Sequence, residues 1–91
     1  MYISVIIPTY NGAHKIENLL SSLVNQTYDS FEVIVVIDGS TDDTKKILSS
    51  FENKINSFLI VDQANGGRSK SRNAGVKLAK GDLLVFFDEK E

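Results

Sequence analysis

The chain has 91 residues, a formal net charge of −2 and no cysteine. The length suits one domain over residues 1–91, and the absence of cysteine excludes disulfides and thiolate metal sites. The charge gives no general attraction to nucleic acid. No basic leader precedes the first apolar stretch, and no apolar run approaches the roughly 20 residues that span a bilayer, so we expect a cytoplasmic chain without a membrane segment.

Short apolar runs alternate with amphipathic stretches from the start of the chain. Residues 3–7 predict a strand that stops at Pro8, because proline lacks a backbone donor. Apolar residues then recur at helical spacing, which predicts a helix over residues 13–25. Residues 31–37 are nearly all apolar and predict a second strand, which a turn signal at Asp38 ends.

The middle of the chain predicts another helix and strand. Ser40 and Asp43 have the spacing of a capping box, so we expect a helix to begin there. Four residues would form its inward face: Thr44, Ile47, Leu48 and Phe51. Residues 58–61 predict a third strand, and residues 63–68 predict a polar loop.

The last third predicts a helix and a final strand. The inward face of the helix is rich in small residues: Ser71, Ala74, Gly75, Leu78 and Ala79. Gly81 is predicted to be its C-cap, and residues 83–87 predict the fourth strand. The order βαβαβαβ indicates an α/β fold, a sheet of four mostly parallel strands, buried on both faces, with helices on both sides.

Ligands of such sheets bind at the carboxyl ends of the strands, so we searched the segments that follow them. Tyr10 could stack on a flat base and Thr9 could hydrogen-bond to its edge, whereas the plainer interpretation is a turn led by Pro8. The carboxylate of Asp38 could accept a hydrogen bond from a ring N–H or a ribose hydroxyl, although Asp-Gly-Ser is also a common turn.

Two further segments carry charge beside predicted strand ends. Arg68, Lys70 and Arg72 follow two glycines, a combination that suits a diphosphate but also a solvated helix start. Asp88 follows the fourth strand, where a carboxylate can hold a divalent cation, and the alternative is a charged terminus. The chain has neither the G-x-G-x-x-G pattern nor a P-loop, which argues against those two phosphate sites.

The order and spacing of five segments resemble family 2 glycosyltransferases. These segments are residues 5–11 (VIIPTYN), 23–28 (LVNQTY), 31–44 (FEVIVVIDGSTDDT), 65–75 (NGGRSKSRNAG) and 80–88 (KGDLLVFFD). The resemblance covers almost the whole chain. It implies a GT-A fold and inverting transfer of sugar from a nucleotide donor, usually a UDP- or dTDP-sugar.

The resemblance also implies roles for individual residues. Thr9 and Tyr10 would line the base pocket, and Asp38 would contact the uracil or thymine ring. Arg72 would approach the diphosphate, with Lys70 as a second candidate.

For the metal, the resemblance implies that Asp88 is the first acid of a D-x-D motif that binds Mg²⁺ or Mn²⁺ with the donor. The chain departs from the family at Lys90, where the second acid would stand, and at Ile37, where the family often has another aspartate. The family's acceptor site and general base lie downstream of this motif, so we expect the 91 residues to bind nucleotide without transferring sugar.

Two other functions fit parts of the pattern. An exposed sheet edge would suit a non-catalytic module that forms homo-oligomers. A receiver-like phosphoacceptor would use Asp38, but it needs acids after the first strand, where this chain has Thr9 and Tyr10.

Overall fold

The fold is described from a computed structural model, which places residues 1–9, 13–25, 30–39, 43–55, 57–63 and 67–87. Seven elements follow one another in the predicted order: β1 (Ile3–Thr9), α1 (Ala13–Val24), β2 (Phe31–Asp38), α2 (Thr44–Ser49), β3 (Phe58–Gln63), α3 (Arg68–Leu78) and β4 (Leu83–Phe86). None of these helices is long and apolar enough to cross a membrane.

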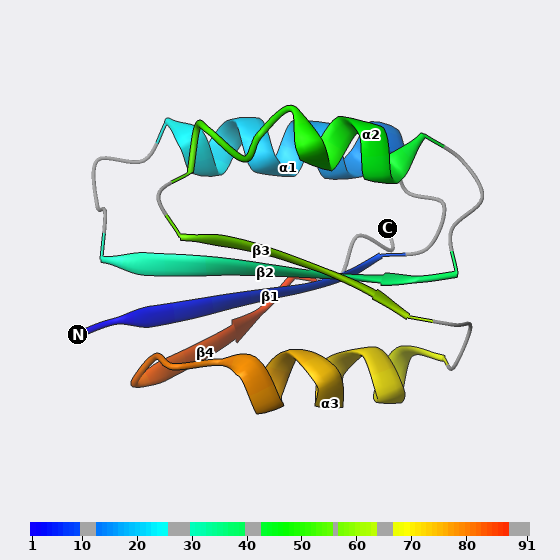
Figure 1. Ribbon diagram of the computed structural model, residues 1–91. Coiled ribbons are helices and arrows are strands. Elements are labelled where there is room, and N and C mark those ends of the chain that lie inside the picture. Colours follow the sequence, from blue (N-terminus) through cyan, green and yellow to red (C-terminus); the bar gives the residue numbers. More distant parts are fainter. Residues whose placement is uncertain (10–12, 26–29, 40–42, 56, 64–66, 88–91) are drawn as a thin grey trace.

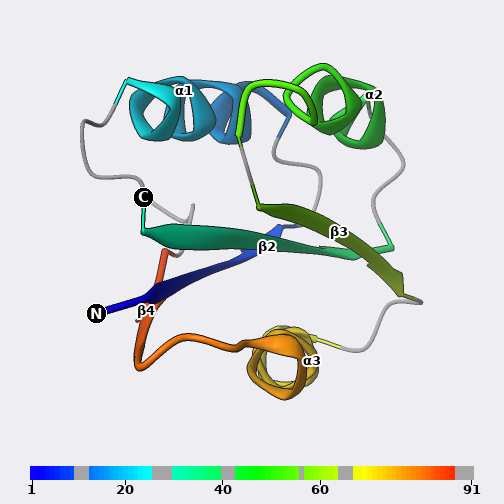
Figure 2. The same ribbon diagram turned by 60° about the vertical axis from the view of Figure 1, so that its left-hand side comes forward.

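One sheet forms the middle of three layers (Figure 1). Its strand order is β3-β2-β1-β4, and every pair of neighbours is parallel. α1 and α2 lie side by side on one face, and α3 lies on the other, as the turned view in Figure 2 shows. The predicted α/β class, with helices on both faces, is confirmed.

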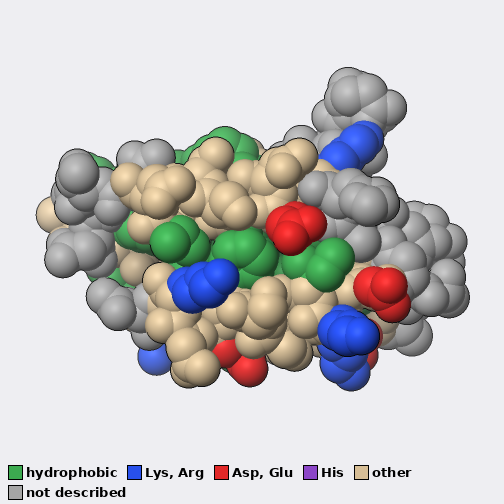
Figure 3. Space-filling model, turned by 90° about the horizontal axis from the view of Figure 1, so that it is seen from above, with side chains coloured by type: hydrophobic (Ala, Val, Ile, Leu, Met, Phe, Trp, Pro, Cys, Tyr) green, Lys and Arg blue, Asp and Glu red, His purple; other side chains and the backbone are tan. Residues whose placement is uncertain are grey.

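The two faces of the sheet have different cores. Side chains of β1 and β2 that point toward α1 and α2 join a cluster with residues of those helices and of the segment after α2: Val5, Ile7, Ile16, Leu20, Val33, Val35, Ile37, Leu48, Phe51 and Ile55. The alternate residues, such as Ile6 and Ile34, are also fully buried and face α3. Seen from above α1 and α2, hydrophobic side chains lie in a line flanked by polar groups (Figure 3).

Pro8 does not end the first strand, so that prediction was wrong. β1 continues to Thr9, and Pro8 lies opposite Val36 of β2. The amide of Phe87 donates to the carbonyl of Ile6, so Ile6 and therefore Pro8 turn their backbone groups toward β4 rather than β2. The N–H that Pro8 lacks would therefore point toward the end of the β1–β4 ladder, and the ladder between β1 and β2 is not interrupted.

Burial on both faces is confirmed for β1 and β2 and was wrong for the edge strands. All residues of β1 and β2 after the first are buried, whereas β3 is exposed at Leu59 and Asp62. In β4 the exposed fractions are 45% for Leu83 and 39% for Phe86. Among the described strands, β3 and β4 each have a neighbour on one side only, so fewer side chains cover them.

Gly81 is not the C-cap of α3, contrary to prediction. The helix ends at Leu78, and Ala79 is its extended C-cap. A Cβ on Gly81 would lie 2.6 Å from the Ser4 hydroxyl and 2.7 Å from the carbonyl oxygen of Tyr2. The glycine is therefore required because the α3–β4 connection passes directly against the start of β1.

A buried carboxylate fixes the same connection. Glu32, at the start of β2, accepts hydrogen bonds from the Ser4 hydroxyl at 2.5 Å and from the amide of Lys80 at 2.6 Å. Ser4 in turn accepts from the amide of Gly81 at 2.8 Å. Hydrogen bonds to an ionised acceptor are among the stronger ones, so this network holds the C-terminal end of α3 against the sheet.

The second helix, α2, ends at Ser49, before the last residue of the predicted inward face, Phe51. α2 begins at Thr44, and its N-cap residue Asp43 makes no side-chain capping hydrogen bond. Ser40, the other half of the predicted capping box, lies outside the described residues. The inward face is confirmed in substance, because Thr44 and Leu48 are fully buried and Phe51, in the following turn, is 5% exposed.

Candidate functional site

The candidate site lies at the carboxyl edge of the sheet, where β1 and β2 end side by side. Thr9 is the last residue of β1 and pairs with Ile37, the neighbour of Asp38. Both polar side chains are buried, with exposed fractions of 2% for Thr9 and 7% for Asp38. The predicted neighbourhood of these two residues is therefore present, at the edge where parallel α/β sheets bind ligands.

Asp38 is tied to the N-terminal end of α3. The amide of Gly67 donates to its Oδ2 at 3.0 Å. Gly67 is the N-cap of α3 and has φ = 90°, a conformation that favours glycine. The partial positive charge at a helix N-terminus also favours a carboxylate. Backbone conformation and electrostatics thus both bring α3 to Asp38.

Gln63 and Ser71 complete the surroundings of this carboxylate. Gln63 lies opposite Asp38 in the register of β3 and β2, and its Nε2 donates to Oδ1 at 3.3 Å and to the Ser71 hydroxyl at 3.0 Å. Sequence reasoning missed both roles: Gln63 was assigned to a loop and Ser71 to a packing face. The register that makes Gln63 the neighbour of Asp38 appears only once the strand order is known.

Arg72 lies on the side of α3 that faces β4. Its guanidinium carbon is 5.4 Å from the centroid of the Phe86 ring, within the range of a cation–π interaction. Lys70 is exposed two residues earlier on the same helix. Residues two apart on a helix do not share a face, so the structure does not bring the two cations together.

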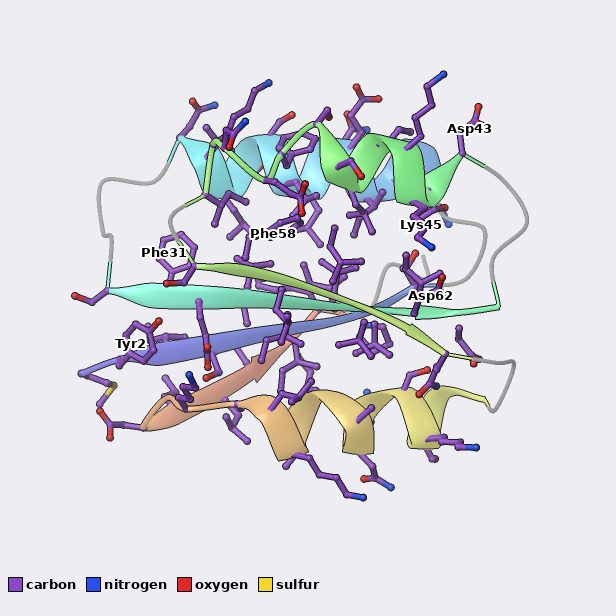
Figure 4. The ribbon with its side chains drawn as sticks, in the orientation of Figure 1. Tyr2, Phe31, Asp43, Lys45, Phe58 and Asp62 are labelled. Atoms are coloured by element: carbon purple, nitrogen blue, oxygen red, sulfur yellow. The ribbon has the colours of Figure 1, made fainter. Side chains whose placement is uncertain are left out.

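An ion pair joins the helical layer to β3 near the same edge. Nζ of Lys45, in the first turn of α2, lies 2.8 Å from Oδ2 of Asp62. Figure 4 shows the two side chains pointing toward each other from α2 and β3. Asp62 points to the opposite face of the sheet from Gln63, so this pair is separate from the Asp38 network.

Two of the predicted site residues lie outside the described residues: Tyr10 and Asp88. Within the described ranges, no group of three or more acidic or histidine side chains could hold a metal ion. β4 ends at Phe86 on the same edge as Thr9 and Asp38, because it runs parallel to β1. Carboxylate oxygen is the ligand chemistry that Mg²⁺ and Mn²⁺ prefer, so Asp88 fits such an ion chemically.

Comparison with known proteins decides the family. The model of the glycosyl transferase family 2 matches residues 4–89. The chain belongs to this family. It has the same α/β architecture as its structural neighbours, which are glycosyltransferases of the GT-A fold.

Similar proteins include enzymes of known and unknown substrate. The chain is 43% identical over 91 residues to the poly(ribitol-phosphate) β-N-acetylglucosaminyltransferase TarS of Staphylococcus aureus, covering 97% of this chain and 16% of that protein. It is 38% identical over 92 residues to a poly(ribitol-phosphate) β-glucosyltransferase of Bacillus spizizenii, covering 97% and 14%. The chain spans 12% to 25% of the lengths of the curated relatives it matches.

Solved structures give the same result for the fold. The crystal structure of S. aureus TarS 1–349 in complex with UDP-GlcNAc matches with a TM-score of 0.91 and 42% identity, over 98% of this chain and 26% of that one. A mannosyltransferase of Pyrobaculum calidifontis in complex with GDP-Man and Mn²⁺ matches with a TM-score of 0.86 and 30% identity, over 96% and 27%. Solved structures that share this sheet therefore include complexes with different nucleotide sugars.

Proposed function

We propose that this chain forms the donor-binding part of a family 2 glycosyltransferase and binds a UDP- or dTDP-sugar at the carboxyl edge of its sheet. The observation that supports this most is the position of Asp38, a buried carboxylate at a strand end, held beside Thr9 and the N-terminus of α3. The TarS structure with UDP-GlcNAc, a neighbour at 42% identity, supports a uridine nucleotide.

Different residues contact the base and the diphosphate of the donor. Asp38 accepts the ring N–H of the base, and Thr9 and Tyr10 line the base pocket. Arg72, with Lys70 as the second candidate, meets the diphosphate. A divalent cation held by Asp88 would neutralise charge on the diphosphate, as Mn²⁺ does in metal-dependent phosphate chemistry. Glu89 and Glu91 flank Lys90, the residue at the second acidic position of the motif.

The parent reaction is an inverting displacement of the nucleoside diphosphate by an acceptor hydroxyl. We propose that the 91 residues bind donor without transferring sugar, since they correspond to a quarter or less of the length of the curated relatives. A cytoplasmic location belongs to the same proposal, because charged nucleotide sugars do not cross a bilayer unaided. Release of UDP from UDP-glucose or UDP-galactose by the purified chain in the presence of acceptor would refute the inactivity.

Titration calorimetry with UDP tests the donor site. We expect micromolar binding that strengthens with Mn²⁺ and weakens at least about tenfold in Asp38→Asn, because a buried carboxylate acceptor is replaced. Asp62→Asn is the matched control, since Asp62 is an exposed strand residue on the opposite face. Equal UDP affinity in Asp38→Asn and the parent chain would contradict the proposal.

One observation favours a second function, self-association as a homo-oligomer. β4 pairs only with β1 among the described strands, and Leu83, Leu84 and Phe86 are 45%, 36% and 39% exposed. An open edge with apolar side chains favours pairing with another chain. Light scattering should then give a mass above 10.1 kDa that falls to the monomer value in Leu84→Lys, and a monomer mass for the parent chain would exclude this function.

A further inference from the structure

We infer that Gln63 and Ser71 are positioning residues that orient the Asp38 carboxylate and thereby set the preference for uracil over cytosine. The inference rests on the proposed function, because it concerns how the same site recognises its base. Gln63 lies outside the five segments that carry the family resemblance, and Ser71 lies in one of them only as part of the inward face of a predicted helix.

The four residues form a closed ring of hydrogen bonds. Gln63 donates to Asp38 and to Ser71, at 3.3 and 3.0 Å. The Ser71 hydroxyl donates to the carbonyl of Gly67 at 3.1 Å, and the amide of Gly67 donates to Asp38 at 3.0 Å. The ring joins β2, β3 and α3, so it couples three elements that are separate in the chain.

Hydrogen-bond chemistry allows only one arrangement of protons in this ring. An ionised carboxylate only accepts, so Gln63 must present its NH₂ group to Asp38. That group has two hydrogens, and the second is donated to the Ser71 hydroxyl. The Ser71 hydroxyl in turn donates its own hydrogen to the Gly67 carbonyl. Each member has a defined role as donor or acceptor, and removal of one side chain removes the hydrogen bonds that it makes to the others.

The ring fixes the plane of the carboxylate. Oδ1 of Asp38 accepts a hydrogen bond from Gln63 of β3, and Oδ2 accepts one from Gly67 at the start of α3. Ser71 is 1% exposed and Asp38 is 7% exposed, so water has little access to replace a lost partner. A carboxylate offers about four acceptor positions, so each of its oxygens can accept from more than one donor.

The ratio of the affinities for uracil and cytosine nucleotides depends directly on the orientation of the Asp38 carboxylate. Uracil presents a ring N–H where cytosine presents a bare acceptor nitrogen, which repels a carboxylate in the same place. An oriented Asp38 therefore favours UDP over CDP, whereas a carboxylate that can turn away loses the attraction and the repulsion together. Sites that hydrogen-bond a specific donor discriminate strongly against a ligand that lacks it.

The test compares UDP and CDP affinities of the 91-residue chain by calorimetry. Gln63→Met keeps the length of the side chain and removes both donors, and Ser71→Ala removes the hydroxyl. Each should reduce the ratio of UDP to CDP affinity by roughly 3- to 10-fold, the effect of one hydrogen bond. Ser71→Thr keeps the hydroxyl and should retain the ratio of the parent chain.

Ser49→Ala is the matched control. Its hydroxyl donates to the carbonyl of Lys45, four residues earlier in α2, at 3.1 Å, the same kind of bond that Ser71 makes to Gly67. This control should leave the UDP to CDP ratio unchanged.

The outcomes separate the inference from the function on which it rests. A parent chain that prefers UDP, with variants that lose UDP and CDP affinity in equal proportion, would assign Gln63 and Ser71 a purely structural role and overturn the inference alone. A parent chain that binds neither nucleotide would overturn the proposed function and the inference with it. Melting curves of all variants accompany the titrations and show which of them are folded. Gln63 is half-buried at the end of an edge strand, so Gln63→Met still tests the inference if Ser71→Ala does not fold.

Discussion

Gly75 sets how closely α3 approaches the sheet, and its replacement by alanine tests that packing. A Cβ on Gly75 would lie 2.5 Å from Cγ2 of Ile6 and 3.5 Å from its Cβ and Cγ1. Carbon atoms in contact normally lie about 3.5 to 4.0 Å apart, so the helix or the strand must move by roughly 1 Å. Ile6 is fully buried in a central strand, and its branched Cβ carries the methyl group that alanine would meet.

Two opposing energies decide the outcome of Gly75→Ala. Overpacking of a core costs about 1 to 3 kcal/mol, and alanine gains about 1 kcal/mol over glycine in a helix. We therefore expect a net loss of about 1 kcal/mol in the free energy of unfolding, and a fall of roughly 4 to 8 °C in Tm for a domain of this size. Ser71 lies one turn before Gly75, so a displaced helix should also weaken UDP binding.

The assay is thermal and urea unfolding followed by circular dichroism, with Lys77→Ala as the control on the exposed part of the same helix. Ile6→Leu removes the γ-methyl branch, and Gly75→Ala should then be neutral or stabilising in that background. A Gly75→Ala variant that raises Tm in the parent chain would refute the steric reasoning. An equal loss in the Ile6→Leu background would refute the assignment to Cγ2.

Three further perturbations have expected outcomes. Gly81→Ala should lower the free energy of unfolding by about 2 to 3 kcal/mol in urea titrations, more than Gly75→Ala, because its Cβ would lie 2.7 Å from two backbone atoms that cannot rotate away; an unchanged midpoint would contradict this. Lys45→Met should cost less than about 1 kcal/mol, since its ion pair with Asp62 has side chains 67% and 50% exposed, and a larger loss at high salt would disprove the surface character of the pair. Phe86→Leu should weaken UDP binding roughly two- to fivefold in calorimetry, because the ring that supports Arg72 is lost. Uridine, which has no diphosphate, should bind as before. An equal loss of affinity for uridine would show that the ring does not act through the diphosphate.

The sequence was sufficient where the local pattern and the tertiary environment agree. β1 and β2 are mostly apolar and are the central strands, and the helical period over residues 13–25 corresponds to α1. Asp38 could be located at the ligand-binding edge because parallel strands place their carboxyl ends together. These features depend only on periodicity and on the chain order of the elements.

The remaining features depend on which elements become neighbours. Gln63 reaches Asp38 because β3 pairs with β2, and Pro8 is tolerated in a strand because its backbone groups turn toward the end of the β1–β4 ladder and not toward β2. Gly81 was read as a helix cap, whereas contact with the start of β1 requires it. Each of these is a contact between residues distant in sequence, which single-sequence periodicity does not contain.

The central claim is that a nucleoside diphosphate binds at the carboxyl edge of the sheet. Amide chemical-shift mapping with UDP tests the location directly, because every non-proline residue reports its own surroundings. The account predicts shifts concentrated at Thr9, Asp38, Gly67 and Arg72, with none at Lys80 on the opposite edge. Shifts centred on Lys80 and the start of β1, or no shifts at millimolar UDP, would contradict it.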